Sequence, residues 1–442
     1  MAEQANDRSV DESTRAGNYF VSNYPPYSFW SADHVADAHA VLNSPPVAQT
    51  PLGIYVHIPF CRKRCHFCYF KVYTDKNAAE VDSYLDALAA ELALYAQKPF
   101  IGGRKPTFIY FGGGTPSYIS STQLSRLVET MKRLLPWSEA QEVAFECEPG
   151  TITEGKLRVI RDLGVTRLSL GIENFDDEIL KANGRAHTSK EIPSSYERAR
   201  SLGFSQINID LIAGMVGETD ENWRDCVRKT LAMAPDSITI YQMEVPYNTT
   251  IFKDMKVYGE TVAPVASWKT KREWVKHAFA EFERAGYTVG SAYTAVKDPS
   301  RTRFLYRDLL WGGADMVGLG VASFSHVQGT HFQNDHEFES YRDTVLGGEL
   351  PIFRALTPSP EDRMIRELVL QMKLGRVFKS YFQKKFGVDL HQSFASPLEK
   401  LQGEGLLTVE PQGVRLSRDG LLQVDRLLLE FFRPEHRGSR HV

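Results

Sequence analysis

The chain has 442 residues, of which 42% are hydrophobic and 24% are charged, and its formal net charge is −3. These values are typical of a folded globular protein with one large domain and a smaller one. A long track for nucleic-acid phosphates needs a surplus of basic residues, which this chain lacks. Charged residues interrupt every apolar run, and the first residues are polar, so we expect neither a membrane span nor a signal peptide. We therefore expect a cytoplasmic, monomeric protein.

The first 51 residues show no sustained periodicity. Residues 1–17 are polar, and the stretch from Tyr19 to about Pro51 is rich in Tyr, Pro and Ala, with Phe29-Trp30 as a candidate anchor. We predict an irregular N-terminal arm that lies on the main domain. A passive linker is the alternative.

Residues 52–325 alternate between strand-like apolar runs and amphipathic helical patterns. The predicted strands lie at residues 53–58, 107–111, 143–146, 167–171, 206–211, 237–242 and near 287–292. The predicted helices lie at residues 78–96, 123–135, 154–163, 191–202, 221–232 and 268–285. Repeated βα units require parallel strands and right-handed crossovers. Six or so units that close only partly would form an α/β fold of the (β/α)6 partial-barrel type, although a full barrel or an open doubly wound sheet fits the periodicity as well.

The C-terminal part follows a different pattern. After a connecting segment at 326–350, residues 351–442 show helical patterns, then a hairpin around a Pro-Gln-Gly turn, and then a helix at 418–431. This order predicts a small winged-helix-like α+β domain. Winged helices often bind DNA, but basic residues are few between 375 and 409. We therefore favour a lid over the mouth of the barrel.

Three of the five cysteines lie close together, in Cys61-Arg-Lys-Arg-Cys65-His-Phe-Cys68, directly after the first predicted strand. Three thiols cannot close a tetrahedral zinc site. On a [4Fe–4S] cluster, three thiolates hold three irons and leave the fourth iron open to a small molecule. We therefore predict a cluster at this loop. Free core cysteines in a reducing compartment are the alternative here, and this is what we expect of the other two cysteines.

A glycine-rich run follows the second predicted strand: Phe-Gly112-Gly113-Gly114-Thr115-Pro. Successive glycines let a backbone approach a ligand without a Cβ in the way. Tight turns also use glycine for purely steric reasons, so this run alone is weak evidence for a ligand site.

Charged side chains recur at or just beyond the ends of the later predicted strands. They are Glu146, Glu173, Arg185 and Asp210. Ligands of α/β folds lie at the carboxyl ends of the strands. Carboxylates can accept from hydroxyl and ammonium groups, whereas a guanidinium can bind a carboxylate through two parallel hydrogen bonds. Solvated or salt-bridged loop residues are the alternative for each of them.

The setting Tyr55-x-His57-Ile-Pro-Phe-Cys61 makes the cysteine motif resemble the signature of radical S-adenosylmethionine (SAM) enzymes. It is most similar to the branch that contains oxygen-independent coproporphyrinogen III dehydrogenase, the heme chaperone related to it, and the class C methyltransferases and cyclopropanases. The resemblance covers nearly the whole chain. It implies a partial barrel, a [4Fe–4S] cluster, SAM, and a one-electron donor such as flavodoxin or ferredoxin. It also implies that Tyr55, the glycine run and the four charged strand-end residues contact SAM.

The same branch implies a second SAM molecule. The stretch that runs from Asp315 through Phe324 to the next serine resembles the family's Gly-x-Gly-x-x-x-x-Ser motif, with Phe324 packed on the second SAM. Counting back along this alignment places Leu305 and Tyr306 at two further contacts, and Gly114 would border the same molecule. Tyr306 could relay a proton or a hydrogen atom, and His57 could donate a proton near the cluster. Either residue could equally be a core residue.

Two positions depart from the dehydrogenase pattern. The dehydrogenase and most of its relatives resemble Gly-Val-Gln where this chain has Gly171-Ile-Glu173, so a carboxylate replaces an amide. Phe70 stands where the dehydrogenase motif has a fourth cysteine in its working site. Phe70 favours the other branches, whereas the N-terminal arm is unlike the heme chaperones. We therefore predict C-methylation or methylene transfer, including cyclopropanation, from a second SAM to an sp2 carbon of a small-molecule substrate. Oxidative decarboxylation of coproporphyrinogen III and heme delivery are the alternatives.

Overall fold

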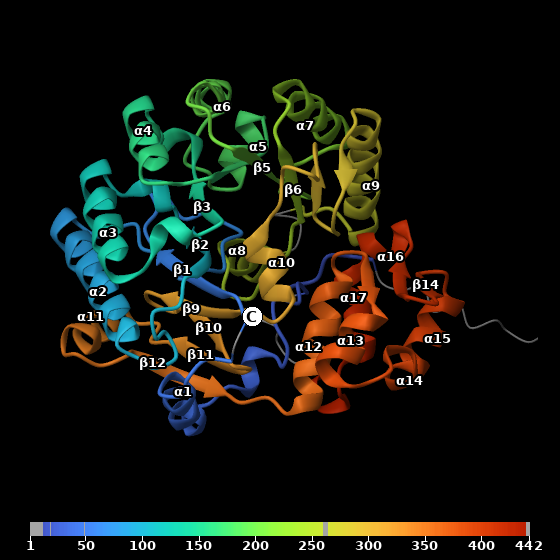
Figure 1. The fold of residues 1–442 in the computed structure, drawn as a ribbon. Helices are drawn as coiled ribbons and strands as arrows, with labels where there is room; N and C mark the ends of the chain where they lie inside the picture. The colour runs from blue at the N-terminus through green and yellow to red at the C-terminus, as the bar shows by residue number, and fades with distance from the viewer. Residues whose placement is uncertain (1–11, 18, 48, 260–263, 439–442) are drawn as a thin grey trace, which may run out of the picture.

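The computed structural model describes residues 12–17, 19–47, 49–259 and 264–438. Its main body is a twelve-stranded sheet in the order β12-β11-β10-β9-β1-β2-β3-β4-β5-β6-β8-β7. Helices α2, α3, α4, α6, α7 and α9 lie around the outside of the strands (Figure 1). Among the described residues, no helix is both long and apolar enough to cross a membrane.

The centre of the sheet is parallel. Its strands are β1 (Leu52–Ile58), β2 (Pro106–Gly113), β3 (Glu142–Cys147), β4 (Arg167–Glu173), β5 (Gln206–Ala213), β6 (Ser237–Gln242) and β9 (Asp315–Leu319). Beyond β6, the short strands β8 (Thr294–Val296) and β7 (Thr288–Val289) are antiparallel. Within the described part of the chain, the end strands β12 and β7 do not pair, so the barrel stays open. The predicted partial barrel is confirmed.

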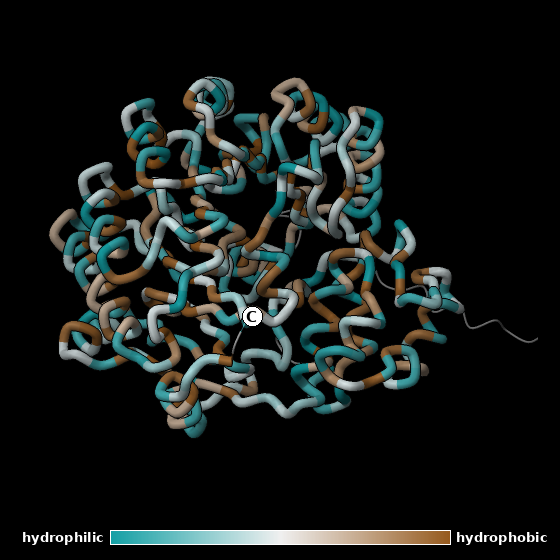
Figure 2. Tube along the Cα trace, in the orientation of Figure 1, coloured by the Kyte–Doolittle hydropathy of each residue, from teal (hydrophilic) through white to brown (hydrophobic). Residues whose placement is uncertain are grey.

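The connecting helices follow from their sequence patterns. They are α2 (Ala78–Ala96), α3 (Ser121–Leu134), α4 (Glu154–Asp162), α5 (Asp177–Ala182), α6 (Glu191–Ser201), α7 (Asp220–Met233), α8 (Thr250–Tyr258), α9 (Trp268–Arg284) and α10 (Leu305–Trp311). A capping box at Asn77 and Glu80 starts α2, and another at Ser120 and Gln123 starts α3. Their apolar faces pack onto the strands, which form the hydrophobic centre of the chain trace in Figure 2.

The N-terminal arm is not irregular throughout. Its described part contains two 3-10 turns (Tyr27–Phe29 and Ala32–His34) and helix α1 (Val35–Leu42), which buries Ala38 and Leu42 against the sheet. Only one of the two predicted anchors is buried, because Trp30 is 5% exposed and Phe29 is 38% exposed. Residues 1–11 lie outside the described residues.

The predicted connecting segment at 326–350 belongs to the sheet instead. Strands β10 (Phe324–Val327), β11 (Thr330–Asn334) and β12 (Ile352–Leu356) extend the sheet beyond β9 as antiparallel strands, with α11 (Phe338–Leu346) between the last two. Gln328 and Gly329, the two residues of the β10–β11 turn, both have positive φ (49° and 85°). Such a turn matches the twist of a tight hairpin, so the chain doubles back here and does not run on as a linker.

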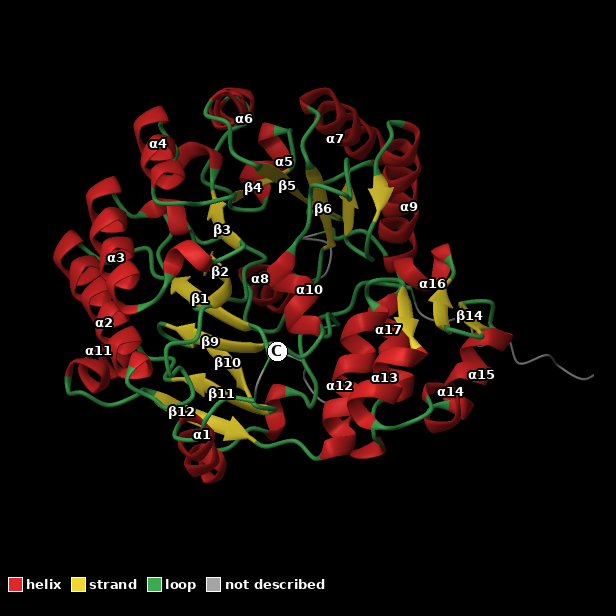
Figure 3. Ribbon diagram, viewed as in Figure 1, coloured by secondary structure: helices red, strands yellow, loops and turns green. Residues whose placement is uncertain are grey.

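The C-terminal part contains helices around a small sheet of order β13-β15-β14 (Figure 3). Its elements are α12 (Pro360–Met372), β13 (Arg376–Phe378), α13 (Lys379–Phe386), α14 (Leu390–Ser393), α15 (Ala395–Gly403), β14 (Leu407–Glu410), β15 (Gly413–Leu416), α16 (Arg418–Leu422) and α17 (Val424–Leu428). The predicted hairpin is confirmed as β14–β15. The helix predicted at 418–431 is interrupted at Gln423, whose φ is −125°.

One carboxylate joins the arm, the barrel and the C-terminal part. Asp425 on α17 accepts hydrogen bonds from the backbone N–H of Val21 (2.8 Å) and from the hydroxyl of Tyr293 (2.5 Å). It also forms an ion pair with the buried Lys373 (2.7 Å). These contacts fix the C-terminal part over the barrel.

Candidate cluster and cofactor site

The cysteine loop begins where β1 ends and is closed at its base. The backbone N–H of Cys61 donates to the carbonyl of Tyr73 (3.0 Å), and the N–H of Tyr73 donates to the carbonyl of Pro59 (2.8 Å). Cys61 is buried, whereas Cys65 and Cys68 are half-buried. Because the loop is tied at both ends, all three thiols stay at the mouth of the barrel.

The thiol environment fits a cluster better than a single metal ion. Among the described residues, no three Cys, His, Asp or Glu side chains are placed to share one ion. A cluster does not need such a group, because each thiolate binds a different iron. Burial raises the pKa of Cys61 to about 12 and the pKa of Cys68 to about 11. Both thiols therefore need a bound cationic centre to become thiolates.

The glycine run packs directly against the cysteine loop. A Cβ on Gly113, whose φ is 111°, would lie 2.5 Å from the imidazole of His57. A Cβ on Gly114 would lie 3.0 Å from the Sγ of Cys61. Thr115, the next residue, donates from its hydroxyl to the same sulfur (3.4 Å). Close packing against the cysteine loop is therefore enough to explain why glycine stands at these two positions. The contact of the glycine run with SAM stays a prediction.

Arg185 connects the cysteine loop to β4. Its Nη1 donates to the Sγ of Cys65 (3.3 Å), its Nη2 donates to the carbonyl of Gly171 (2.6 Å), and its Nη2 lies 3.6 Å from a carboxylate oxygen of Glu173. Glu173 has a φ of 65°, at an irregularity in the pairing of β4 with β5. Burial raises the pKa of Glu173 to about 7. The Nε of Arg185 is buried without a partner, so one donor is left for a bound group.

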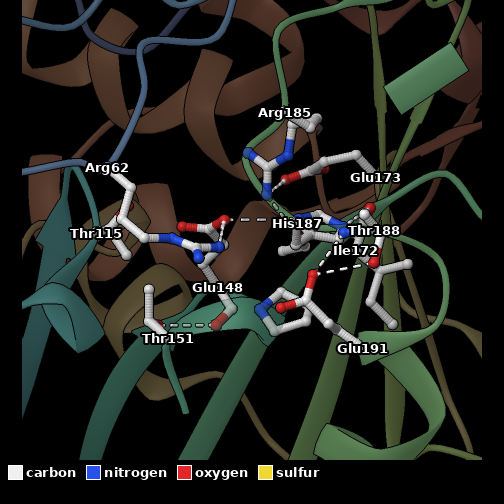
Figure 4. A network of polar contacts seen from close by, with 12 residues as sticks. Arg62, Thr115, Glu148, Thr151, Ile172, Glu173, Arg185, His187, Thr188 and Glu191 are labelled. Carbon is white, nitrogen blue, oxygen red and sulfur yellow. Dashed lines mark hydrogen bonds and ion pairs between the residues drawn. The ribbon is translucent and has the colours of Figure 1, made fainter. Parts of the chain in front are cut away.

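A second ion pair holds the other end of the cysteine loop and was missed in the sequence. Arg62 donates to Glu148 (2.8 Å), and His187 lies 3.8 Å from the same oxygen (Figure 4). Burial opposes ionisation of Glu148, but the nearby imidazole of His187, the hydrogen bond from Arg62 and the charge of Arg185 outweigh it and lower its pKa to about 2. The motif Glu146-Cys-Glu148-Pro contained the signal, because its two carboxylates stand two residues apart at the carboxyl end of β3.

Two further predicted carboxylates lie inside the barrel. Glu146 accepts from the hydroxyl of Tyr110 (2.5 Å), and burial raises its pKa to about 7. Asp210 accepts from Ser169 (2.6 Å) and Asn208 (2.8 Å), and burial raises its pKa too. Both oxygens are thus held in place by neighbouring donors while they face a cavity.

A cavity of about 1560 Å³ runs from the cysteine loop to the arm and the C-terminal part. The predicted side chains on its wall are Tyr55, His57, Cys68, Thr115, Glu146, Glu173, Arg185, Asp210, Tyr306 and Phe324. Residues 19–23 of the arm and residues 421–426 of α16 and α17 complete the wall. Ordinary small-molecule pockets are about 300–1,000 Å³, so this cavity has room for a cofactor together with a substrate.

Comparison with known proteins agrees with this architecture. Residues 55–230 match the Radical SAM superfamily, and residues 359–422 match the HemN C-terminal domain. The heme chaperone HemW of Bacillus subtilis is 30% identical, over 83% of this chain and 96% of its own length. This chain belongs to the HemN/HemW family of radical SAM proteins. Its cofactors are therefore a [4Fe–4S] cluster and SAM.

Other relatives of this HemN-like protein also align along almost the whole chain. The oxygen-independent coproporphyrinogen III oxidase of Helicobacter pylori is 28% identical over 88% of both chains. The solved structure of coproporphyrinogen III oxidase (HemN) from Escherichia coli superposes with a TM-score of 0.79 at 25% identity, and covers 93% of this chain and 96% of that one. The shared length includes the arm, the barrel and the C-terminal domain.

Three tyrosine rings stack on one another inside the HemN-like barrel. The rings of Tyr55 and Tyr110 stack at 6.0 Å between centroids, and those of Tyr110 and Tyr306 stack at 4.4 Å. The hydroxyl of Tyr55 lies 3.2 Å from the Nδ1 of His57, and burial lowers the pKa of His57 to about 4. His57 is therefore a neutral residue near the cysteine loop, and its buried Nε2 has no partner. Its role as a proton donor stays a prediction.

Of the predicted second-SAM contacts, one lies elsewhere. Leu305 is not on the wall of the large cavity and borders a separate one of about 370 Å³. It starts α10, and the carboxylate of Glu142 accepts its backbone N–H (3.0 Å), which turns the next residue, Tyr306, toward the cavity. Phe324 does line the cavity, but its ring packs on Tyr27 of the arm, with 4.3 Å between centroids. The second-SAM contacts of Leu305, Tyr306 and Phe324 stay predictions.

Proposed function

We propose that this HemN-like enzyme oxidatively decarboxylates a propionate side chain of a coproporphyrinogen-type tetrapyrrole. The bound cluster and SAM supply a 5′-deoxyadenosyl radical when the cluster is reduced by one electron. Transfer of a hydrogen atom from the propionate β-carbon to this radical, followed by loss of CO2 and one electron, would leave a vinyl group. The electron passes to a one-electron acceptor such as an oxidised ferredoxin or flavodoxin.

The observation that carries this proposal is the composition of the cavity wall. The arm, the barrel and α16–α17 all contribute to one large cavity, and the full-length likeness to coproporphyrinogen III oxidases covers the same three parts. Cys61, Cys65 and Cys68 would hold the cluster, and Arg185, Glu146 and Asp210 would orient SAM. Closure by α17 would keep water away from a reactive carbon radical.

Methyl transfer from a second SAM is the second candidate. Phe70 favours it, because this residue stands where the dehydrogenase motif has a fourth cysteine in its working site. The Phe70 side chain is 45% exposed and lines the cavity. The relatives named above are coproporphyrinogen oxidases and a heme chaperone, which gives methyl transfer no support of its own.

Anaerobic turnover of the reconstituted protein with a reductant, SAM and coproporphyrinogen III tests the proposal. Decarboxylation yields 5′-deoxyadenosine and a product that has lost the elements of CO2 and H2 by mass spectrometry. Formation of S-adenosylhomocysteine together with a methylated product would establish the second candidate instead. Tight heme binding with no conversion of either kind would indicate a chaperone.

A further inference from the structure

Two arginines on the cavity wall, the buried Arg366 and the half-buried Arg354, form no ion pair with a carboxylate of the described residues. Arg366 of α12 is 3% exposed, and its closest acceptors are the Oδ1 of Asn23 (2.8 Å) and the carbonyl of Leu310 (3.5 Å). Arg354 of β12 donates to Gln333 (2.7 Å) and to the carbonyl of Tyr27 (3.0 Å). All of these acceptors are neutral.

Such an arrangement is costly unless another group completes it. Removing a guanidinium from water carries a large desolvation penalty, and buried charges are normally paired. The carboxylate next to Arg366 in sequence, Glu367, is already bonded to Lys385 (2.6 Å). The cavity is therefore the place from which a counter-charge can reach Arg366.

Neighbouring side chains have unsatisfied polar atoms as well. Asn23, Trp30 and His331 all line the cavity, are 6%, 5% and 1% exposed, and have a buried nitrogen without a partner (Nδ2, Nε1 and Nε2). The ring of Trp30 stacks on that of His331, with 5.3 Å between centroids and 10° between planes. Asn23 is bonded to Arg366 itself, so the unsatisfied groups and the unpaired arginine form one cluster.

We propose that Arg366, Arg354, Asn23, Trp30 and His331 form a carboxylate-binding subsite for one acidic arm of the substrate. A carboxylate has about four acceptor positions and can bind a guanidinium through two parallel hydrogen bonds. It would supply both the missing charge and the missing acceptors. The identification of the acidic arm as a propionate rests on the proposed function.

The subsite and the cysteine loop lie on different sides of the cavity. Arg185, beside Cys65, is bonded to β4, whereas His331 and Arg354 lie on β11 and β12, beyond β9 on the other side of β1. A substrate anchored at the subsite therefore spans the mouth of the barrel toward the cluster loop. Its length from the anchored carboxylate to the reacting carbon then decides which carbon the radical meets.

Binding of coproporphyrin III to the cluster-loaded protein, measured by fluorescence titration, tests the subsite. Hydrogen bonds to a charged group are each strong enough that Arg366→Gln and Arg354→Gln should weaken binding about tenfold or more. The tetramethyl ester should bind wild type and variants alike, because it has no carboxylate. Trp30→Phe, which keeps the ring and removes the N–H, should give a smaller loss for the acid alone. Arg126→Gln, on the outside of α3, is the matched control and should change nothing.

A second readout does not depend on the tetrapyrrole. Propionate, but not propionamide, should raise the melting temperature of the wild-type holoprotein and should not raise that of Arg354→Gln. Equal stabilisation of both proteins by propionate, or none of the wild type, overturns the subsite. So does an equal loss of acid and ester affinity in the arginine variants. If propionate acts as expected while coproporphyrinogen is not converted, the subsite stands and the proposed function fails. Should Arg366→Gln not fold, the milder Arg354 and Trp30 variants decide.

Discussion

Glu146 should be a carboxylate that destabilises the fold at neutral pH. Burial raises its pKa from 4.5 to about 7, so the folded chain binds this proton more tightly than the unfolded chain does. Stability therefore falls as pH rises from about 4.5 to 7, and the penalty is complete above that range. At about 1.4 kcal/mol per pKa unit this amounts to ~3 kcal/mol, and the open side toward the cavity reduces it to about 1–3 kcal/mol.

Glu146→Gln removes the ionisable group and keeps an acceptor for Tyr110. In urea unfolding of the SAM-free holoprotein, this variant should be more stable than wild type by about 1–3 kcal/mol at pH 8, and the gain should fall to about a quarter of that size at pH 5. Glu154→Gln, at an exposed pair with Arg158, should show no such gain. A gain for Glu146→Gln of the same size at both pH values would refute the reasoning. SAM should bind the variant more weakly than wild type if the Glu146 carboxylate contacts the cofactor.

Three more predictions follow from the site. Cys65→Ala should abolish 5′-deoxyadenosine formation and the cluster absorbance, whereas Cys147→Ala should keep both; an active Cys65 variant would exclude the cluster assignment. Arg185→Met should raise the SAM concentration needed to change the EPR signal about tenfold or more, and an unchanged titration would remove Arg185 from the SAM site. Asp425→Ala should cost about 3 kcal/mol of unfolding free energy, because it leaves Lys373 buried and unpaired; a loss below ~0.5 kcal/mol would contradict this.

The central sheet could be predicted because its pattern is local. Each strand from β1 to β6 is a short apolar run followed by an amphipathic helix, and buried side chains such as Ile54, Val56 and Ile58 mark such a run directly. The cysteine loop could be predicted for a similar reason, since its spacing is a property of eight consecutive residues.

The rest of the site depends on contacts between distant segments. The pairing of Arg62 with Glu148, or of Asn23 with Arg366, follows only from how the loops and the arm fold together. The β10–β11 hairpin was missed because its turn residues, Gln328 and Gly329, give a weaker signal than Asn-Gly. Leu305 and Tyr306 are adjacent in sequence but border different cavities, because successive side chains of a helix point in different directions about its axis.

Residues 421–426, which complete the cavity wall, are synthesised long after the cysteine loop. The cysteine loop leaves the ribosome early, whereas residues 421–426 follow hundreds of positions later, and at ordinary translation rates this separates the two by tens of seconds. During that interval the nascent barrel has no cover, and the three thiols are open to a carrier protein that brings an iron–sulfur cluster. Once α17 is docked through Asp425, Cys68 lines a cavity sized for small molecules, and α16 and α17 form part of its wall. Cluster delivery is therefore sterically easiest before α17 docks.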